Sequence, residues 1–338
     1  MDAFISVIIV TYNYANLLPR ALNACANQTF RDFEIVIVDN GSTDNTKEII
    51  SQFIGEHPEL RITVEKVDKN IGPAKGYNTG ITAAVGKYIM FNDADDWMEG
   101  DCLEFLAIKA KETGADRVSG LYREVDTEGK LLRNVAFEEG MSYWLFLEFQ
   151  GSIFRRNIFL EHNIFAPLDI GPLVDTYIGP NFLQYSQKET LHNKVVYNYV
   201  INPYSISGAK NGLNSVDLTR VTFERIFMPI YNNIKDNDIR EEIEYCLIKR
   251  YYTILLHYNR YNSYIETLNN YKAAREIIRK NLPCYLTCRK LTLFRKNGDR
   301  KNGRTITWIL SRLEELHLMG LFLKFYIFFS RFMYLHSR

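Results

Sequence analysis

Cysteine is scarce in this chain, and its spacing excludes the two structures that cysteines most often build. Five cysteines occur in 338 residues. Two of them, Cys284 and Cys288, lie one helical turn apart, but no second pair or nearby histidine completes a zinc site, and no spacing suggests a disulfide framework. Free thiols are typical of a reducing compartment, so we expect a cytoplasmic protein. The cysteines are Cys25, Cys102, Cys246, Cys284 and Cys288.

Several common sequence signals are also missing. Residues 1–4 lead directly into an apolar run, without the charged region or cleavage site of a signal peptide. No G-x-G-x-x-G follows the first expected strand, so the dinucleotide fingerprint fails. Residues 80–87 resemble a phosphate-binding loop but are one residue too long, and Tyr88 stands where Ser or Thr would bind magnesium. A dehydrogenase or a kinase is therefore poorly supported.

Net charge is nearly absent, with 41 Lys and Arg against 40 Asp and Glu. The balance hides an asymmetry: residues 271–338 hold 15 basic and 4 acidic side chains, whereas the first 270 residues hold 26 basic and 36 acidic ones. A basic tail on an acidic body indicates a negatively charged partner for the tail. No nucleic-acid motif accompanies it, so we expect no nucleic acid among the partners.

Short apolar runs alternate with helical segments through the first 91 residues. Runs rich in β-branched residues predict buried strands, and clusters of turn residues separate them from the helices. This alternation predicts βαβ units and a mostly parallel sheet. The expected strands are 4–10, 33–38, 62–67 and 87–91, and the expected helices are 15–28, one reaching 54, and 73–85.

The rest of the chain has a different pattern. Residues 116–135 predict a hairpin with Glu128 and Gly129 at its turn. Beyond Asn214 the sequence is mostly helical, and the best candidate for a domain junction is the segment 207–212. The long periodic stretches are 216–234, 239–258 and 264–280.

Polar residues follow three of the expected strands abruptly. In an open α/β sheet, ligands bind beyond the carboxyl ends of the strands, so these residues should lie at one binding edge. They are Thr11, Tyr12 and Asn13 after the first strand, Asp39 and Asn40 after the second, and Asn92 to Asp96 after the fourth.

The acidic cluster after the fourth strand predicts a metal site. Asp93, Asp95 and Asp96 fall within four residues, and carboxylates packed this closely repel unless a cation or a proton intervenes. Mg²⁺ and Mn²⁺ prefer oxygen ligands and take one or two carboxylates together with water and phosphate oxygens. The alternative is a solvated loop whose aspartates cap a helix beginning near Asp101.

Four ordered motifs resemble those of the family 2 glycosyltransferases. The resemblance is continuous over about the first 125 residues, weakens to about residue 207 and is absent beyond. The motifs are SVIIVTYN (6–13), VIVDNGSTD (36–44), NIG with NTGI (70–72 and 78–81) and GKYIMFNDADD (86–96).

The resemblance implies a GT-A fold, that is, a Rossmann-like, mostly parallel sheet that binds a nucleotide-sugar, followed here by a C-terminal helical extension. It implies an inverting transfer that needs Mn²⁺ or Mg²⁺, with a UDP-sugar as the expected donor. The expected domains are 1–210, catalytic, with a nucleotide-sugar and metal half (1–125) and an acceptor half (126–210), and 211–338, helical with a basic amphipathic tail.

Individual site residues follow from the same motifs. Thr11 and Tyr12 match residues lining the base pocket, Asp39 matches the carboxylate that reads the uracil or ribose, and Asp93 and Asp95 match the metal-binding D-x-D pair. Two alternatives stay open, because Asn13 could cap the next helix and Asp39 could close an Asx turn. The expected donor-site residues are Thr11, Tyr12, Asn13, Asp39, Asn40, Lys75, Asn78, Asp93, Ala94 and Asp95.

The third motif departs from the family. Many relatives carry Ala-Arg-Asn where this chain has Gly76, Tyr77 and Asn78, and in them the arginine helps to hold the diphosphate. Lys75 could supply the positive charge instead, or the metal could carry it alone. The departure puts the donor preference in doubt.

The family's catalytic base is an aspartate at the start of a helix in the second half, and the matching residue is Asp175, with Asp169 as the fallback. The alternative for Asp175 is a helix N-cap. Arg155 and Arg156 could hold phosphate or start a helix, and Trp97 could stack on a sugar or belong to the core.

The C-terminal segment 316–335 is long enough to span a bilayer, but Lys324 and Arg331 interrupt it. His317, Lys324, Arg331 and Arg338 recur every seven residues on one helical face, and basic residues between Arg289 and Arg304 lie just upstream. This pattern predicts that 316–335 is a helix lying on an anionic membrane surface, with residues 285–338 as the contact region. The alternative is a buried or oligomer-forming helix.

Membrane attachment would place the enzyme on the inner face of the plasma membrane, extending a lipid-linked saccharide or a polysaccharide. The competing function is a catalytically silent sugar-nucleotide or glycan-binding subunit of a synthase complex.

Overall fold

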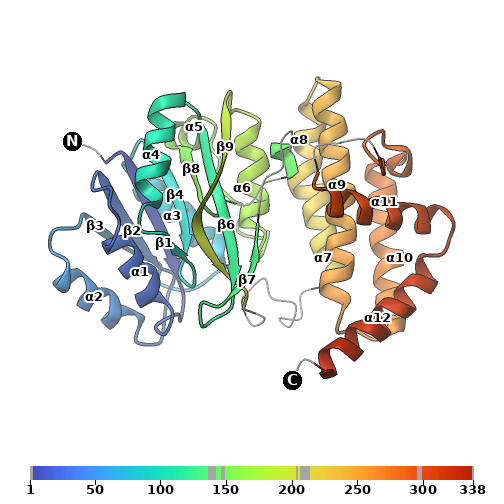
Figure 1. The fold of residues 1–338 in the computed structure, drawn as a ribbon, viewed down its shortest axis with the longest axis horizontal. Helices are drawn as coiled ribbons and strands as arrows, with labels where there is room; N and C mark the ends of the chain where they lie inside the picture. Colours follow the sequence, from blue (N-terminus) through green and yellow to red (C-terminus); the bar gives the residue numbers. More distant parts are fainter. Residues whose placement is uncertain are drawn as a thin grey trace. The chain divides into compact units, whose positions relative to one another are not determined.

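The computed structural model describes residues 3–135, 142–145, 149–202, 205, 214–294 and 299–336, with side chains up to Phe329 in the last helix. The chain forms two compact units, residues 1–137 with 147–202, and residues 138–146 with 203–338 (Figure 1). The expected junction at 207–212 lies outside the described residues, and the domain boundary at 210 stays a prediction.

The first unit is built on one mixed sheet. Strands β3, β2, β1 and β4 are parallel neighbours, and β8 pairs antiparallel with β4. Within the described residues the sheet order is β3-β2-β1-β4-β8-β6-β9-β5, with β7 paired to β6. The strands are β1 (Ile5–Thr11), β2 (Phe33–Asp39), β3 (Ile62–Lys66), β4 (Tyr88–Asp93), β5 (Trp97–Met98), β6 (Arg117–Val125), β7 (Leu131–Asn134), β8 (Ser152–Arg155) and β9 (Glu189–Val200).

Helices cover both faces of the central strands, which explains why β1 and β2 are mostly apolar. Their buried polar residues satisfy each other, because the hydroxyl of Ser6 donates to the carboxylate of Glu34 at 2.5 Å. On one face, Val7 and Ile9 of β1 join a core that includes Leu22 and Leu106. On the other face, α3 packs so closely that a Cβ on Gly80 would come 2.3 Å from Cγ2 of Ile8. The helices of this unit are α1 (Leu18–Ala26), α2 (Thr46–Glu56), α3 (Pro73–Ala83), α4 (Cys102–Thr113), α5 (Arg156–Glu161) and α6 (Val174–Leu183).

The second unit is helical. Its core includes a buried carboxylate, Glu314, which accepts hydrogen bonds from the hydroxyls of Tyr252 and Tyr285 and pairs with Arg275 at 3.0 Å. Its elements are two 3₁₀ turns (Tyr143–Leu145 and Tyr285–Thr287), α7 (Ser215–Arg220), a π-helical segment (Val221–Phe227), α8 (Met228–Asn233), α9 (Asn237–Asn259), α10 (Tyr264–Asn281), α11 (Lys301–Glu315) and α12 (Met319–His336).

The expected α/β fold is confirmed, as are the 116–135 hairpin and the three long helical stretches. The boundaries of the first helix were wrong, because Asn13 adopts a positive φ of 55° and the chain turns before α1 begins at Leu18. In the hairpin, Gly129 provides the expected turn with a φ of 90°.

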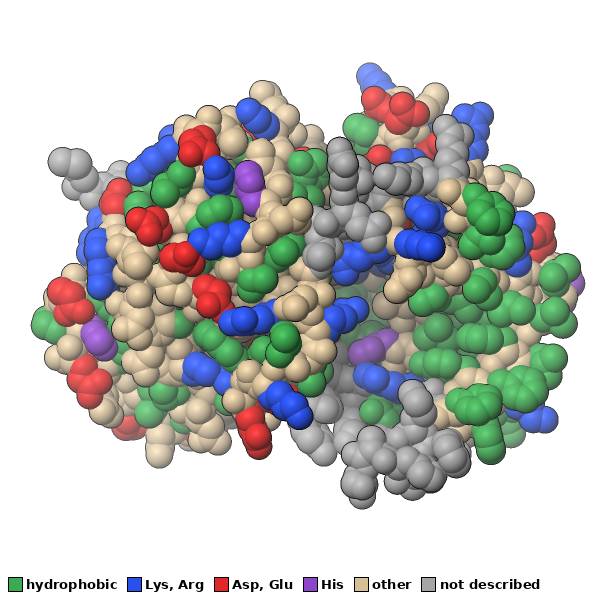
Figure 2. Space-filling model, in the orientation of Figure 1, with side chains coloured by type: hydrophobic (Ala, Val, Ile, Leu, Met, Phe, Trp, Pro, Cys, Tyr) green, Lys and Arg blue, Asp and Glu red, His purple; other side chains and the backbone are tan. Residues whose placement is uncertain are grey.

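The expectation that His317 shares one helical face with Lys324 is wrong, because His317 adopts a positive φ of 59° and α12 begins only at Met319. Binding of α12 to a membrane surface stays a prediction. One face of α12 is buried against α10 and α11, whereas the opposite face exposes apolar side chains, part of which Figure 2 shows in green. Within the part of the chain that the structure describes, no helix has the length and apolar character needed to cross a membrane.

Candidate active site

The carboxyl ends of β1, β2 and β4 bring most of the expected donor-site residues to one edge of the sheet. Thr11 and Asp39 are register partners, and Asp93 lies opposite Val10, one residue earlier in β1. Thr11 and Asp39 are buried, whereas the Tyr12 ring is exposed. This edge is the candidate active site.

Hydrogen bonds join the loops that follow β1 and β2. The backbone N–H of Asn13 donates to Oγ of Ser42 at 3.0 Å, and Oδ1 of Asn13 accepts from the N–H of Thr43 at 2.8 Å. The idea that Asn13 caps the next helix is wrong, since Leu17 is the N-cap of α1. One carboxylate oxygen of Asp39 accepts from the N–H of Ser42 at 2.8 Å, which closes the local turn considered for it.

Two asparagines, Asn40 and Asn78, form hydrogen bonds to backbone segments that neighbour the site. The side-chain amide of Asn40 donates to the carbonyl of Gly72 at 3.1 Å, just before α3 begins, while its buried Oδ1 has no partner among the described residues. Asn78 on α3 donates to the carbonyl of Ala166 at 2.8 Å and accepts from its N–H at 2.9 Å. Asn78 thus holds the backbone of a neighbouring segment. Contact of Asn78 with the nucleotide-sugar stays a prediction, as does contact of the exposed Lys75.

The three aspartates after β4 have different surroundings. Asp96 is buried, accepting from the N–H of Val200 at 2.7 Å and from the hydroxyl of Tyr197 at 3.0 Å. It therefore anchors the acidic loop to β9. Asp93 and Asp95, separated by the buried Ala94, remain partly exposed. The alternative that these aspartates cap a helix is wrong, because the N-cap of α4 is Asp101 and the side chain that bonds its first turn is Gln28, whose Oε1 accepts from the N–H of Leu103 at 3.0 Å.

Both carboxylate oxygens of Asp93 are engaged. Oδ1 accepts a hydrogen bond from the hydroxyl of Tyr77, and Oδ2 accepts from Nε2 of Gln150 at 3.4 Å. Tyr77 stands where many relatives carry arginine, so at this position a neutral donor replaces a cation. Neither bond could be predicted from the sequence, because Tyr77 and Gln150 lie 16 and 57 residues from Asp93 along the chain.

Burial raises the pKa of every carboxyl in the cluster, and the charges of neighbouring aspartates raise it further for Asp95 and Asp96. Burial raises the pKa of Asp93, although hydrogen bonds from Tyr77 and Gln150 oppose the shift. Burial and then the charge of Asp93 raise the pKa of Asp95 to about 7. The pKa of Asp96 is well above its usual range because of burial and its two acidic neighbours. A cation between these groups would relieve the repulsion.

The residues at this edge fit a divalent cation that completes its coordination with ligand oxygens. Among the described residues, no group of three His, Cys, Asp or Glu side chains could hold a metal by itself. Mg²⁺ and Mn²⁺ need only one or two carboxylates when phosphate and water supply the remaining oxygens. Asp93 and Asp95 supply two carboxylates at the sheet edge.

Asp175 lies in the first turn of α6, which packs against α3. Its Oδ1 accepts from the N–H of Thr176 at 2.6 Å, and the helix N-cap is Leu173, so the N-cap alternative is wrong. The charge of Asp175 joins that of Asp93 in raising the pKa of Tyr77, after the larger effect of burial. The fold therefore brings Asp175 into the electrostatic neighbourhood of the acidic cluster, whereas Asp169 is exposed in the preceding loop.

Arg20 was missed by sequence reasoning, which had no signal for it. Its Nη2 donates to the backbone carbonyl of Asp95 at 3.0 Å, and its guanidinium lies 4.0 Å from the ring centre of Trp97. One face of Trp97 is thereby occupied. Arg155 pairs with Asp116 at 2.5 Å and lies opposite Tyr88, at the amino end of β4, so it is not a phosphate ligand at this edge.

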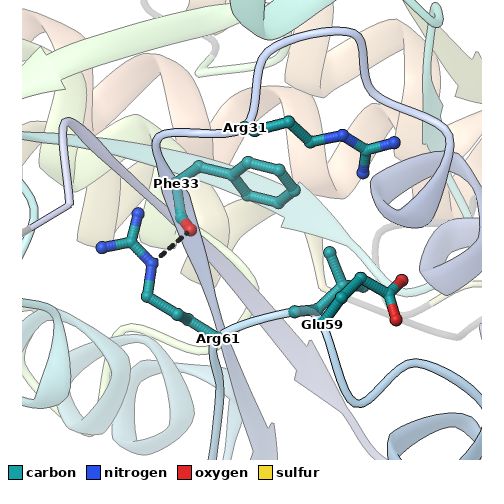
Figure 3. A pocket seen from close by; sticks show the side chains of 5 residues that line it. Arg31, Phe33, Glu59 and Arg61 are labelled. Carbon is teal, nitrogen blue, oxygen red and sulfur yellow. Dashed lines mark hydrogen bonds between the residues drawn. The ribbon is translucent and has the colours of Figure 1, made fainter.

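A separate pocket lies at the opposite edge of the sheet (Figure 3). It is lined by Phe33, the first residue of β2, and by Arg31, Glu59, Leu60 and Arg61. Because Asp39 stands at the other end of the same strand, this pocket is not part of the candidate active site.

Comparisons with known proteins agree with this geometry. Residues 6–167 match the family model described as glycosyl transferase family 2. The chain is 31% identical over 230 residues to an uncharacterized glycosyltransferase, alr2836, of Nostoc sp., covering 64% of this chain and 68% of that protein. It is 31% identical over 229 residues to glycosyltransferase GlyA of Streptococcus pneumoniae, covering 61% of this chain but only 32% of that protein.

Among solved structures, S. aureus TarS 1–349 in complex with UDP-GlcNAc superimposes with a TM-score of 0.71 and 19% identity, over 95% of this chain and 90% of that one. At that identity the likeness establishes the fold alone. The fold is GT-A, with a helical C-terminal region. The chain belongs to glycosyl transferase family 2.

Proposed function

We propose that this chain is an inverting, metal-dependent glycosyltransferase that moves a sugar from a UDP-sugar to an acceptor hydroxyl of a lipid-linked saccharide or a polysaccharide. The observation that carries the proposal is the grouping of Asp39, Asp93 and Asp95 at one sheet edge. Asp175 is close enough that its charge, like those of Asp93 and Asp95, raises the pKa of Tyr77. Family membership makes glycosyl transfer the natural chemistry of such an edge.

Each donor-site residue has a distinct part in the proposal. Tyr12, whose ring is exposed beside buried Thr11, stacks on the base, and Asp39 accepts hydrogen bonds from the uracil or ribose through its second oxygen. Asp93 and Asp95 hold Mn²⁺ or Mg²⁺. An ion held there would supply positive charge that stabilises the diphosphate as a leaving group.

Asp175 is the proposed general base. As the acceptor hydroxyl attacks C1 of the sugar, Asp175 takes its proton, the new C1–O bond forms, and the bond from C1 to the diphosphate breaks on the opposite face. An α-linked UDP donor of the D-series then gives a β product.

The donor site is tested by calorimetric titration with UDP, GDP, CDP and dTDP, each with and without Mn²⁺, in the wild type and in Asp95→Asn. Metal-dependent binding of UDP that the substitution abolishes supports the proposal. Binding of another nucleotide would correct the donor, and binding of none would overturn the donor site. Metal-dependent UDP binding without turnover on any acceptor would instead favour a silent binding subunit, to which the replacement of the family arginine by Tyr77 lends some support.

The basic, apolar C-terminal region supports the proposed acceptor class and location. A lipid-linked acceptor would place the enzyme at the cytoplasmic face of the plasma membrane. Incubation with radiolabelled UDP-sugar and bacterial lipid extracts tests this, because transfer of label to an organic-soluble product supports it. Label appearing only in water-soluble products would overturn it.

A further inference from the structure

Helix α12 has two apolar faces, and only one of them is covered. Met319, Leu323 and Ile327, spaced four residues apart, are almost fully buried against the second unit, where α12 contacts α10 and α11. The hydroxyl of Tyr326 also donates to the carbonyl of Leu256 on α9 at 3.0 Å. These contacts fix the rotation of the helix about its own axis.

That rotation leaves the opposite face exposed. Phe328 is 64% exposed, and the other members of this face are more than 40% exposed. Their spacing of three, four and seven residues places them on one stripe of the helix. The stripe consists of Leu318, Leu321, Phe325, Phe328 and Phe329.

Helix α11 extends the same apolar surface. Ile306, Ile309 and Leu316 are exposed at spacings of three and seven residues. Green side chains gather in Figure 2 over the region where Figure 1 draws these helices. A soluble monomer rarely exposes so many large apolar side chains on two consecutive helices, so this surface, here called the α11–α12 face, has a partner.

The charge around the α11–α12 face indicates what the partner is. Lys324 is exposed beside Phe325 on α12. Of the four acidic residues in 271–338, Asp299 and Glu314 are buried and paired with Lys249 and Arg275, Glu315 pairs with Arg312, and Glu276 is exposed. Acids elsewhere in the second unit pair with three of the basic residues, namely Glu224 with Lys280, Glu241 with Arg289 and Glu242 with Lys290, which still leaves a basic excess. Residues 271–338 hold 15 basic and 4 acidic side chains in total.

We propose that the α11–α12 face docks on an anionic lipid bilayer. The Phe, Leu and Ile side chains enter the boundary between headgroups and acyl chains, and Lys324 remains at the level of the lipid phosphates. A second copy of this chain is a poorer partner, because it would bring an equally basic surface against this one. The docking is a separate property from glycosyl transfer and is measured without substrates.

The experiment is co-sedimentation of the full chain with vesicles of phosphatidylcholine alone or with about 30% phosphatidylglycerol. We expect binding to the anionic vesicles that weakens in 0.5 M NaCl, and at least about tenfold weaker binding of Phe325→Glu/Phe328→Glu. Lys324→Glu should lower binding severalfold while leaving the apolar stripe intact. The matched control is Leu132→Glu, which puts the same charge on an exposed leucine of β7 in the other unit.

Metal-dependent nucleotide binding and circular dichroism of each variant show that it is folded. Equal sedimentation of all variants, or no sedimentation of the wild type with anionic vesicles, would overturn the proposal. Lipid-independent dimers that Phe325→Glu/Phe328→Glu dissociates, found by light scattering in the absence of vesicle binding, would also overturn it and assign the face to a second copy.

Discussion

The hydroxyl of Tyr77 donates a hydrogen bond to Oδ1 of Asp93. Through this bond α3 fixes the orientation of a carboxylate at the end of β4. The two rings of Tyr77 and Phe91 pack edge to face at 5.7 Å, which holds the phenol in place. We expect Tyr77 to position Asp93 for the metal and not to contact the diphosphate itself.

Removing the Tyr77 hydroxyl should weaken metal binding. In Tyr77→Phe the ring packing is kept, but Asp93 loses a donor that stabilises its charged form, so we expect about tenfold weaker Mn²⁺-dependent UDP binding by calorimetry. The matched control is Tyr88→Phe, which removes a buried hydroxyl that donates at 2.8 Å to Ala115, away from the site. Similar losses in both variants would contradict a positioning role.

The effect of Mn²⁺ on stability should depend on pH. Without metal, burial and Asp93 raise the pKa of Asp95 to about 7, so between about pH 4 and 7 the folded chain holds a proton that the unfolded chain has released. This contribution to the unfolding free energy falls as pH rises through that window. Mn²⁺ replaces the proton, so its stabilising effect should grow over the same window.

We expect Mn²⁺ to raise the melting temperature by about 3–8 °C at pH 7.5 and by much less at pH 5.5 in differential scanning fluorimetry. The control is Asp95→Asn, measured at both pH values, because it keeps every other titrating group. In this variant the Mn²⁺-induced rise in melting temperature should be the same at pH 7.5 and pH 5.5. An equal shift at the two pH values would count against a metal site at Asp95.

Loss of the general base should affect turnover and spare donor binding. For Asp175→Asn we expect UDP affinity within about twofold of the wild type and turnover reduced by about 10²–10⁴-fold. Asp169→Asn is the comparison, because Asp169 is exposed six residues earlier and should keep most of the activity. If Asp169→Asn is the inactive variant, the base has been assigned to the wrong aspartate.

The close packing of α3 on β1 predicts opposite effects at two helical glycines. Gly80→Ala would place a Cβ 2.3 Å from Ile8, so we expect a loss of about 1–3 kcal/mol in unfolding free energy. Gly55→Ala on α2 meets nothing within 4 Å and should gain about 0.5–1 kcal/mol. Urea denaturation of both variants checks this prediction. Equal changes in the unfolding free energy would show that the contact between α3 and β1 has room for a side chain at residue 80.

The central sheet and its binding edge could be predicted because they depend on local patterns. Mostly apolar runs define β1 and β2, and the polar residues at which these runs stop, Thr11 and Asp39, are the last residues of the two strands. The sequence could not predict which of the three aspartates anchors the loop and which remain partly exposed. Asp96 is set apart from Asp93 and Asp95 only by its bonds to Tyr197 and Val200, which are more than 100 residues away.

The same limit applies to the flank of the site. Asn78 lies in a motif that indicates donor binding, yet its amide is bonded to Ala166, 88 residues later. Arg20 belongs to no motif, and its contacts to Asp95 and Trp97 arise only when α1 packs beside β5. Contacts of this kind are set by the tertiary fold and leave no periodicity in the sequence.

The phenol of Tyr197 bonds both the N–H of Asp93 and the carboxylate of Asp96. Since Tyr197 lies on β9, the acidic loop acquires its final shape only after the ribosome has released residue 200. During synthesis, the segment carrying all four family motifs therefore emerges long before the strand that organises its acidic loop. A fragment ending near residue 125 would contain all four family motifs and still lack the Tyr197 hydroxyl that bonds Asp93 and Asp96.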